Sequence, residues 1–288
     1  MKSIKKIIKS QRVDMGGILL DQPLPNEFMD QFDPFLLIHH WNDPLKGNQK
    51  QSEVGVGPHP HCGFSPVTLI FKGGVHHRDS RGNNSIVTAG GTQWMFAGKG
   101  ITHSERPTKE LAENGGEFEL IQFWVNVPAK DKMKEPYYTP ITKNETPVFV
   151  LEDEKVKVKI VSGEFKNIKG IIQHFTPVTT LVFEFEKEGE IDFKIPAEYN
   201  TLIYVLDGEL EINNSEIAKD KTLTCFNNDG ESIKLKANQN TNAILLAGKP
   251  INEEVVSYGP FVLNNHNQVL QALRDAQMGK MGVLIEEF

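Results

Sequence analysis

Hydrophobic and polar residues alternate along much of this chain, in short runs rich in β-branched and aromatic side chains. Such runs predict β-strands, because side chains on a strand point alternately to its two faces. Turn-forming clusters of glycine, asparagine and aspartate separate the runs. The clearest expected strands are 35–38, 67–71, 118–125 and 181–185. Many short strands with regular turns favour β-barrels or sandwiches, so we predict an all-β fold.

The chain repeats one pattern at about half its length. Residues 68–71 lead into Gly73-Gly74, and residues 201–204 lead into Asp207-Gly208 in the same way. A length of 288 residues suits two domains. A polar, proline-containing stretch, 128–147, lies between the two halves. We therefore predict two tandem barrels, residues 1–135 and residues 147–288.

One short helix is expected near the C-terminus. Asn265 is a typical N-cap residue, Gln268 follows it at the capping-box position, and Gly279 is placed to end the helix. The apolar stripe between them consists of Val269, Leu270, Leu273 and Ala276.

Composition narrows the class of protein. Hydrophobic residues make up 39% and charged residues 24%, as in globular proteins, and the formal net charge of −7 argues against direct nucleic-acid binding. Cys62 and Cys225 are too few for a disulfide framework, which favours a reducing compartment. The basic start of the chain has no continuous apolar core, and no run approaches the roughly 20 apolar residues of a membrane span. We expect a cytoplasmic protein that does not bind membranes.

The candidate chemistry lies in a cluster of histidines. His59 and His61 are two residues apart, as are His103 and Glu105, so each pair projects from one face of its strand. If the two strands are neighbours in a barrel, three imidazoles and a carboxylate converge on one metal ion. This nitrogen and oxygen set fits Fe(II), Mn(II), Ni(II), Zn(II) or Cu(II) and leaves coordination positions open. Gly98-Lys99-Gly100 predicts a sharp turn before the second pair.

Nearby residues receive lesser roles. His76 and His77 are expected around the site rather than as ligands. Cys62 follows His61 directly, so it should face away from the metal as a small buried residue. His39 and His40 adjoin an apolar strand, one pointing inward to a hydrogen bond and the other outward. The aromatic residues near the ligand strands serve either the core or an apolar substrate pocket. They are Phe64, Phe71, Trp94 and Phe96.

These segments together resemble the pirin family of the cupin superfamily. The similarity covers nearly the whole chain, and its most specific part ends in the second ligand pair. The matching segments are 58–64 (PHPHCGF), 77–80 (HRDS), 93–105 (QWMFAGKGITHSE), 126–133 (NVPAKDKM) and 258–264 (YGPFVLN). The chain departs from the family where Cys62 replaces a usual basic residue and Ser65-Pro66 stands where an acidic residue is common. A second carboxylate near the metal is thereby lost.

The resemblance implies two cupin barrels, with a metal in the N-terminal barrel held by His59, His61, His103 and Glu105. The C-terminal barrel should lack ligands, since residues 196–201 contain no His-x-His pair. Family members are iron-containing, which favours one Fe(2+) per chain. Some cleave the flavonol quercetin with dioxygen, and others regulate transcription or metabolism through protein partners.

Two functions therefore stay open. As a quercetin 2,3-dioxygenase, the protein would bind a small aromatic substrate such as a flavonol together with dioxygen. The catalytic residue Glu105 would either stay on the metal throughout or detach from it to accept the substrate's proton. As a metal-dependent regulator, it would act on a protein partner.

Overall fold

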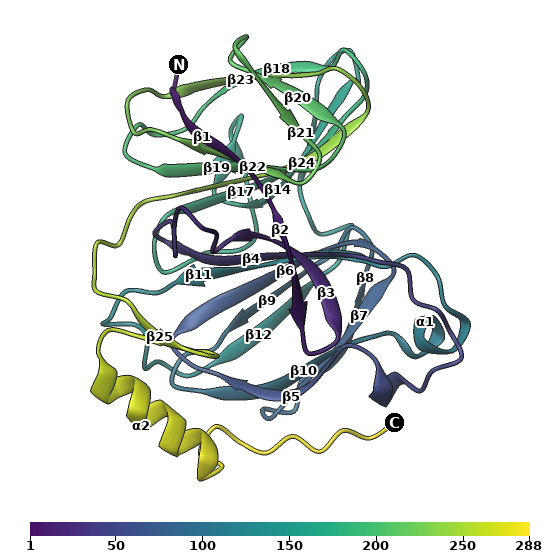
Figure 1. Ribbon diagram of the computed structural model, residues 1–288, viewed down its shortest axis with the longest axis vertical. Coiled ribbons are helices and arrows are strands. Elements are labelled where there is room, and N and C mark those ends of the chain that lie inside the picture. The colour runs from purple at the N-terminus through teal and green to yellow at the C-terminus, as the bar shows by residue number, and fades with distance from the viewer. The chain divides into compact units, whose positions relative to one another are not determined.

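The computed structural model describes all 288 residues, which form 26 strands, two α-helices and one short 3-10 turn, η1 (Gln51–Glu53). The strands build two β-barrels, each from a seven-stranded and a four-stranded antiparallel sheet (Figure 1). The predicted all-β fold of two barrels is confirmed. The alternation of hydrophobic and polar residues that predicted this fold is matched by the burial of the side chains. In β11 (Glu119–Asn126), every second side chain is buried.

The first barrel comprises residues 13–20, 35–145 and 251–288. Its larger sheet has the order β12 (Tyr137–Ile141), β9 (Thr92–Phe96), β6 (Phe64–Lys72), β11, β4 (Phe35–Asn42), β3 (Ile18–Leu24), β2 (Gln11–Met15). Its smaller sheet has the order β5 (Val56–His61), β10 (Ile101–Pro107), β7 (Gly74–Asp79), β8 (Asn84–Thr88). The hairpin of β25 (Val256–Tyr258) and β26 (Phe261–Leu263) and the helices α1 (Lys109–Asn114) and α2 (His266–Gln277) complete it.

The second barrel comprises residues 1–12, 21–34 and 146–250. Its larger sheet has the order β1 (Ile4–Lys9), β22 (Thr222–Phe226), β19 (Asn200–Asp207), β24 (Thr241–Gly248), β17 (Val178–Phe185), β14 (Val156–Ser162), β13 (Val148–Val150). Its smaller sheet has the order β18 (Glu190–Lys194), β23 (Ser232–Ala237), β20 (Glu209–Ile212), β21 (Glu216–Lys219). A small hairpin joins β15 (Glu164–Phe165) to β16 (Ile168–Lys169).

The two strand orders correspond position by position, which explains the repeated pattern in the sequence. β6, which contains residues 68–71, has the same place in its sheet as β19, which contains residues 201–204. By the same correspondence, β18 is the counterpart of β5 and β23 is the counterpart of β10. The equivalent of the first ligand strand is therefore 190–194 and not 196–201, as the sequence comparison had placed it.

The limits of the two compact units differ from the predicted domains 1–135 and 147–288. Each unit takes in a terminal segment from the opposite end of the chain. β1 pairs with β22 through Ile7 opposite Thr224, so the N-terminus joins the second barrel. Residues after 250 return to the first barrel, where Phe261 forms a β-bridge with Cys62. Strand pairing over large sequence separations decides these limits, and local composition does not reveal it.

Helix α2 matches the predicted C-terminal helix closely. The side chain of Asn265 accepts a hydrogen bond from the backbone N–H of Gln268, and Gly279 follows the helix with φ +71°. Val269 and Ala272 are buried, whereas Leu270, expected in the apolar stripe, is 49% exposed. Neither helix has the length and apolar character that crossing a bilayer requires.

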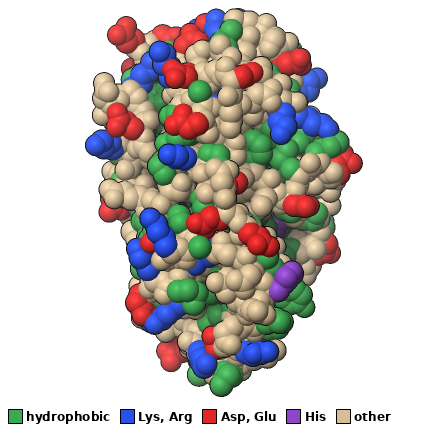
Figure 2. Space-filling view, turned by 90° about the vertical axis from the view of Figure 1, so that its left-hand side faces the viewer, with side chains coloured by type: hydrophobic (Ala, Val, Ile, Leu, Met, Phe, Trp, Pro, Cys, Tyr) green, Lys and Arg blue, Asp and Glu red, His purple; other side chains and the backbone are tan.

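Charged side chains of both signs are intermingled on the face shown in Figure 2. Lysine and arginine alternate there with aspartate and glutamate and do not gather into one large basic area. A mixed surface of this kind is consistent with the acidic net charge.

Candidate metal centre

Three of the predicted ligands lie on two neighbouring strands of the smaller sheet of the first barrel. Antiparallel pairing of β5 with β10 places His103 opposite His59 and Ile101 opposite His61. Residues i and i+2 of a strand share a face, so the three imidazoles point to one side. One ring nitrogen of each lies within 4.8 Å of the others. The convergence predicted from the spacing is confirmed for these three residues.

Backbone carbonyls fix which ring nitrogens of the β5 histidines carry protons. Nδ1 of His59 donates to the carbonyl of Gly57 at 2.8 Å, and Nδ1 of His61 donates to that of Pro260 at 3.4 Å. A carbonyl only accepts, so Nε2 carries the lone pair in each neutral ring. The two Nε2 atoms lie 3.1 Å apart. Metal–nitrogen bonds of about 2.1 Å at a right angle give a separation of about 3.0 Å, so this spacing suits two neighbouring ligands.

His103 is oriented by a buried pair behind it, His77 and Asp79. Burial would raise the pKa of Asp79, but hydrogen bonds from His77, Asn83 and Arg81 lower it below its usual range. The Asp79 carboxylate therefore accepts from Nε2 of His77 at 3.0 Å, which leaves Nδ1 of His77 as an acceptor. That atom lies 3.5 Å from Nδ1 of His103, which donates to it.

These hydrogen bonds leave one ring nitrogen of His103, Nε2, as an acceptor without a donor. Its Nε2 is buried and has no hydrogen-bond partner. Burial also lowers the pKa of all three histidines, and those of His61 and His103 fall well below 6.5. Neutral imidazoles with free Nε2 lone pairs are the form that binds a cation. The residues present thus fit a metal cofactor.

Glu105 lines the same cavity, but its carboxylate has other partners. Oε1 accepts from the Thr68 hydroxyl at 3.2 Å, and Oε2 accepts from the Gln122 amide at 2.7 Å. Nε1 of Trp124 donates to the Gln122 oxygen at 3.1 Å and so fixes the amide. The pairing of β10 with β5 is irregular between His103 and Glu105. The group of converging ligand atoms comprises the three histidines, and ligation by Glu105 stays a prediction.

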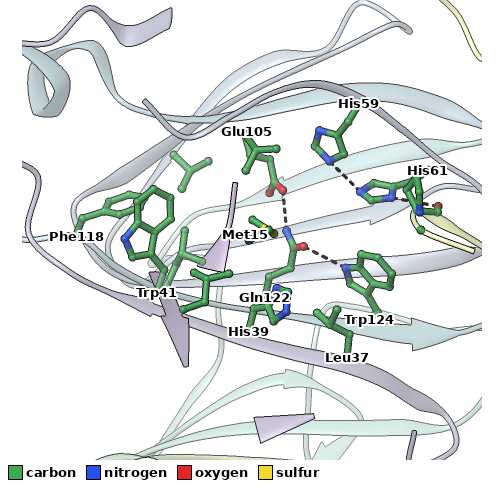
Figure 3. A pocket seen from close by; sticks show the side chains of 16 residues that line it. Met15, Leu37, His39, Trp41, His59, His61, Glu105, Phe118, Gln122 and Trp124 are labelled. Carbon is green, nitrogen blue, oxygen red and sulfur yellow. Dashed lines mark hydrogen bonds between the residues drawn. The ribbon is translucent and has the colours of Figure 1, made fainter. Parts of the chain in front are cut away.

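A cavity of about 470 Å³ opens beside these groups. Figure 3 shows His59 and His61 on one side of it, Glu105 hydrogen-bonded to Gln122, and Trp41, Phe118 and Trp124 around the remainder. Alternate residues of the paired strands β4 and β11 line it: Leu37, His39, Trp41, Leu120, Gln122 and Trp124. A volume and lining of this kind suit a small, largely apolar molecule.

The aromatic residues named from the sequence do not line this cavity. Phe64 packs against Trp124 at 4.2 Å between ring centroids, behind the cavity wall. Trp94 is paired opposite Val67, so it lies on the sheet face away from Thr68. Phe96 contacts Tyr137, and Phe71 shares the face of Val67. The strand phase excludes Trp94 and Phe96, whereas Phe64 shares the phase of Thr68 but lies behind Trp124. Alternation within 118–125 would have identified Leu120, Gln122 and Trp124.

The structure also tests the expectations for Cys62 and for the pair His39 and His40. Cys62 is buried among Phe261, Val269 and Met281, away from the histidines, and burial raises the pKa of its thiol to about 11. It is a small buried residue, as predicted. His39 points into the cavity, whereas His40 is fully buried on the other face and bonds to Glu119 at 3.1 Å. The expectation that one of this pair points outward to solvent is wrong.

The turn before His103 requires both of its glycines. Gly98 and Gly100 have φ of +50° and +136°. A Cβ atom on Gly98 would lie 2.2 Å from the carbonyl oxygen of Lys134, and one on Gly100 would lie 2.5 Å from Met281. Close packing against the Lys134 backbone on one side and the Met281 side chain on the other therefore holds this turn in place before β10.

Comparison with known proteins gives the same picture over the whole chain. Two family models match: Pirin over residues 18–125 and the Pirin C-terminal cupin domain over residues 180–282. A pirin-like protein from Caulobacter vibrioides is 32% identical over 284 residues, covering 97% of this chain and 99% of that protein. A pirin-like protein from Solanum lycopersicum is 31% identical over 282 residues, covering 97% of this chain and 92% of that protein.

Among solved structures, quercetin 2,3-dioxygenase from Acinetobacter baumannii is similar throughout. The two superpose with a TM-score of 0.93 at 30% identity, covering 99% of this chain and 100% of that one. The matching models, the relatives and the shared two-barrel architecture agree that this chain belongs to the pirin family of the cupin superfamily.

Proposed function

We propose that this protein is a mononuclear metal-dependent dioxygenase of the quercetin 2,3-dioxygenase type, which cleaves flavonols with dioxygen. Its ligands would be His59, His61, His103 and Glu105, and its metal Fe(2+). One observation carries the proposal: three neutral imidazoles, those of His61 and His103 buried and that of His59 half-buried, converge at the wall of an apolar cavity of about 470 Å³. The similarity to the Acinetobacter baumannii enzyme supports it. We place the protein in the cytoplasm, in keeping with two buried, free cysteines.

A bound divalent ion would supply Lewis acidity and open positions for substrate and dioxygen oxygens. The chain itself would hold the substrate. Trp41, Phe118 and Trp124 line an apolar space. This space would exclude water and orient a flat, ring-containing molecule toward the histidines.

Glu105 would leave the metal to accept a proton from a substrate hydroxyl. Gln122 holds its Oε2 at 2.7 Å, whereas the contact of its Oε1 with Thr68 is longer, at 3.2 Å. A substrate hydroxyl can replace the Thr68 hydroxyl as donor to Oε1 with little rearrangement. Gln122 thus orients the carboxylate while one of its oxygens receives the proton.

The test is anaerobic loading with Fe(2+), followed by oxygen uptake and carbon monoxide release with a panel of flavonols. Stoichiometric uptake and release with at least one flavonol supports the enzyme. A fully loaded protein that turns over none of them would overturn it. The other function expected from the sequence, a regulator acting through a protein partner, would then be the one to pursue.

A further inference from the structure

The strand that carries His103 and Glu105 has a second face, and the end of the chain covers it. Thr102, Ser104 and Arg106 alternate with the two inward residues and so point away from the cavity. The segment after α2, residues 281–288, runs along this side of the barrel, beside β5 and β10 in Figure 1. The N–H of Thr102 donates to the carbonyl of Met281 at 3.2 Å, and its hydroxyl donates to that of Gly282 at 2.9 Å.

A buried ion pair fastens the far end of this segment to β10. Glu286 accepts two hydrogen bonds from Arg106, from Nε at 2.9 Å and from a terminal nitrogen at 2.7 Å. The side chains are only 9% and 6% exposed. The other terminal nitrogen of Arg106 donates to the carbonyls of Ser52 and Val54, which lie just before β5. One side chain therefore connects the chain end to both ligand strands.

Glu286 also balances a second cation, Arg78. Arg78 lies 3.8 Å from its carboxylate, and the Phe288 ring lies over both guanidinium groups at 5.1 and 5.5 Å. Ser104 is fully buried on the same side of β10 as Arg106. Without this carboxylate, two buried guanidinium groups would face each other unpaired, which is costly.

This attachment coincides with the weakest part of the ligand sheet. The register of β10 against β5 shifts between His103 and Glu105, so regular ladder bonds are interrupted where Ser104 lies. The Glu286–Arg106 pair supports β10 two residues beyond that position. On the other strand, the same C-terminal region supplies the Pro260 carbonyl that accepts from His61.

We propose that Glu286 is a positioning residue for the metal centre, which it acts on through Arg106. The segment 281–288 is a strap that holds β10 so that His103 and Glu105 keep their places. This inference rests on the proposed metal site, and its test separates the two.

Glu286→Gln keeps the shape of the side chain and removes its charge. The matched control is Glu287→Gln, the same change on the neighbouring, exposed residue. Affinity for Co²⁺ is measured by competition with a chelator, together with the visible spectrum of the bound ion. We expect roughly 10-fold weaker binding and an altered spectrum for Glu286→Gln, since outer partners of ligands affect affinity on that scale. Glu287→Gln should match the wild type, and Glu286→Asp should recover part of the loss.

Amide hydrogen exchange in the metal-free protein provides a second measurement. Residues 101–107 should exchange faster in Glu286→Gln than in the wild type or in Glu287→Gln. Wild-type Co²⁺ affinity, spectrum and exchange in a folded Glu286→Gln protein would overturn the positioning role. A wild type that binds no Co²⁺ would instead overturn the proposed function, and this inference with it. If Glu286→Gln does not fold, Phe288→Leu removes only the ring over the two arginines and should weaken binding about threefold.

Discussion

At the residue scale, each histidine of the trio has one nitrogen committed and one available. The carbonyls of Gly57 and Pro260 and the His77–Asp79 pair take up the three Nδ1 protons, so three Nε2 lone pairs remain. The neutral state follows from burial, which lowers all three pKa values. Polar groups outside the trio thus determine that it presents acceptors rather than donors.

Glu105→Gln tests whether Glu105 takes part in catalysis or only in binding. The change keeps an oxygen and removes the charge and the basic site, so the three histidines should still bind metal, more weakly. Turnover of a flavonol should fall by roughly 10²-fold or more, the scale for loss of a positioned base. Absorbance titration should show flavonol binding weakened much less. Glu117→Gln, on a side chain that is 79% exposed, is the control. Full activity in Glu105→Gln would exclude a proton-accepting role.

Asp79→Asn tests the fixed orientation of His103. An amide at position 79 can donate a hydrogen bond to His77 as well as accept one. His77 is then no longer fixed as the acceptor for the His103 N–H. We expect metal affinity to fall by about 10- to 100-fold, with the fold retained in far-UV circular dichroism. Asp153→Asn, in an exposed turn, should change nothing. Equal affinities in both variants would show that His103 does not need this support.

The spacing of His59, His61 and His103 was enough to predict the trio, because strand periodicity is local. His77 was expected around the site, but the sequence did not reveal that it supports His103, nor that Gln122 supports Glu105. Gln122 reaches Glu105, and His77 reaches His103, only through the register of β11 and β10 with their neighbours. Strand pairing sets this register, and a shift of one residue would turn each side chain to the other face. The same uncertainty led to the choice of Trp94 and Phe71 for the cavity.

At the element scale, Lys132 joins three segments of the first barrel. Its ammonium donates to the carbonyl of Gly63 and the side chain of Asn126, both at 2.6 Å, and to the carbonyl of Val262 at 3.1 Å. These lie just before β6, at the end of β11 and in β26. Burial lowers the pKa of Lys132 from 10.5 to about 8. The unfolded chain therefore binds the Lys132 proton more tightly than the folded chain does.

This difference predicts how stability depends on pH. Between pH 8 and 10.5 the unfolded chain binds the Lys132 proton and the folded chain does not, so stability rises with pH in that window. From about pH 7.5 to about pH 9.5, the unfolding free energy of the wild type should gain roughly 2 kcal/mol relative to Lys132→Met. Urea unfolding of both proteins at the two pH values measures the gain. The variant should be less stable throughout, because three acceptors lose their donor. Parallel pH dependences would contradict the lowered pKa.

At the scale of the whole molecule, one architecture is used twice with different interiors. β18 and β23, the counterparts of the two ligand strands, carry the buried apolar side chains Ile191, Phe193 and Leu235. Those three side chains belong to a hydrophobic cluster that fills the second barrel. The first barrel retains a cavity where the second has a packed core. Duplication with divergence of a few inward positions is enough to separate a candidate reactive barrel from a structural one.

The protein should therefore bind one metal ion per chain, and binding should stabilise one barrel only. Elemental analysis after loading and desalting should give one equivalent, since Ile191, Phe193 and Leu235 offer no donor atoms. At a free metal concentration of about 100 times the dissociation constant, the first barrel should gain roughly 2.7 kcal/mol. Hydrogen exchange should report added protection in residues 35–145 and 251–288, with 146–250 unchanged. His59→Ala combined with His103→Ala should abolish both effects. Two tightly bound ions, or protection that extends through β18 and β23, would show that the second barrel also has a metal site.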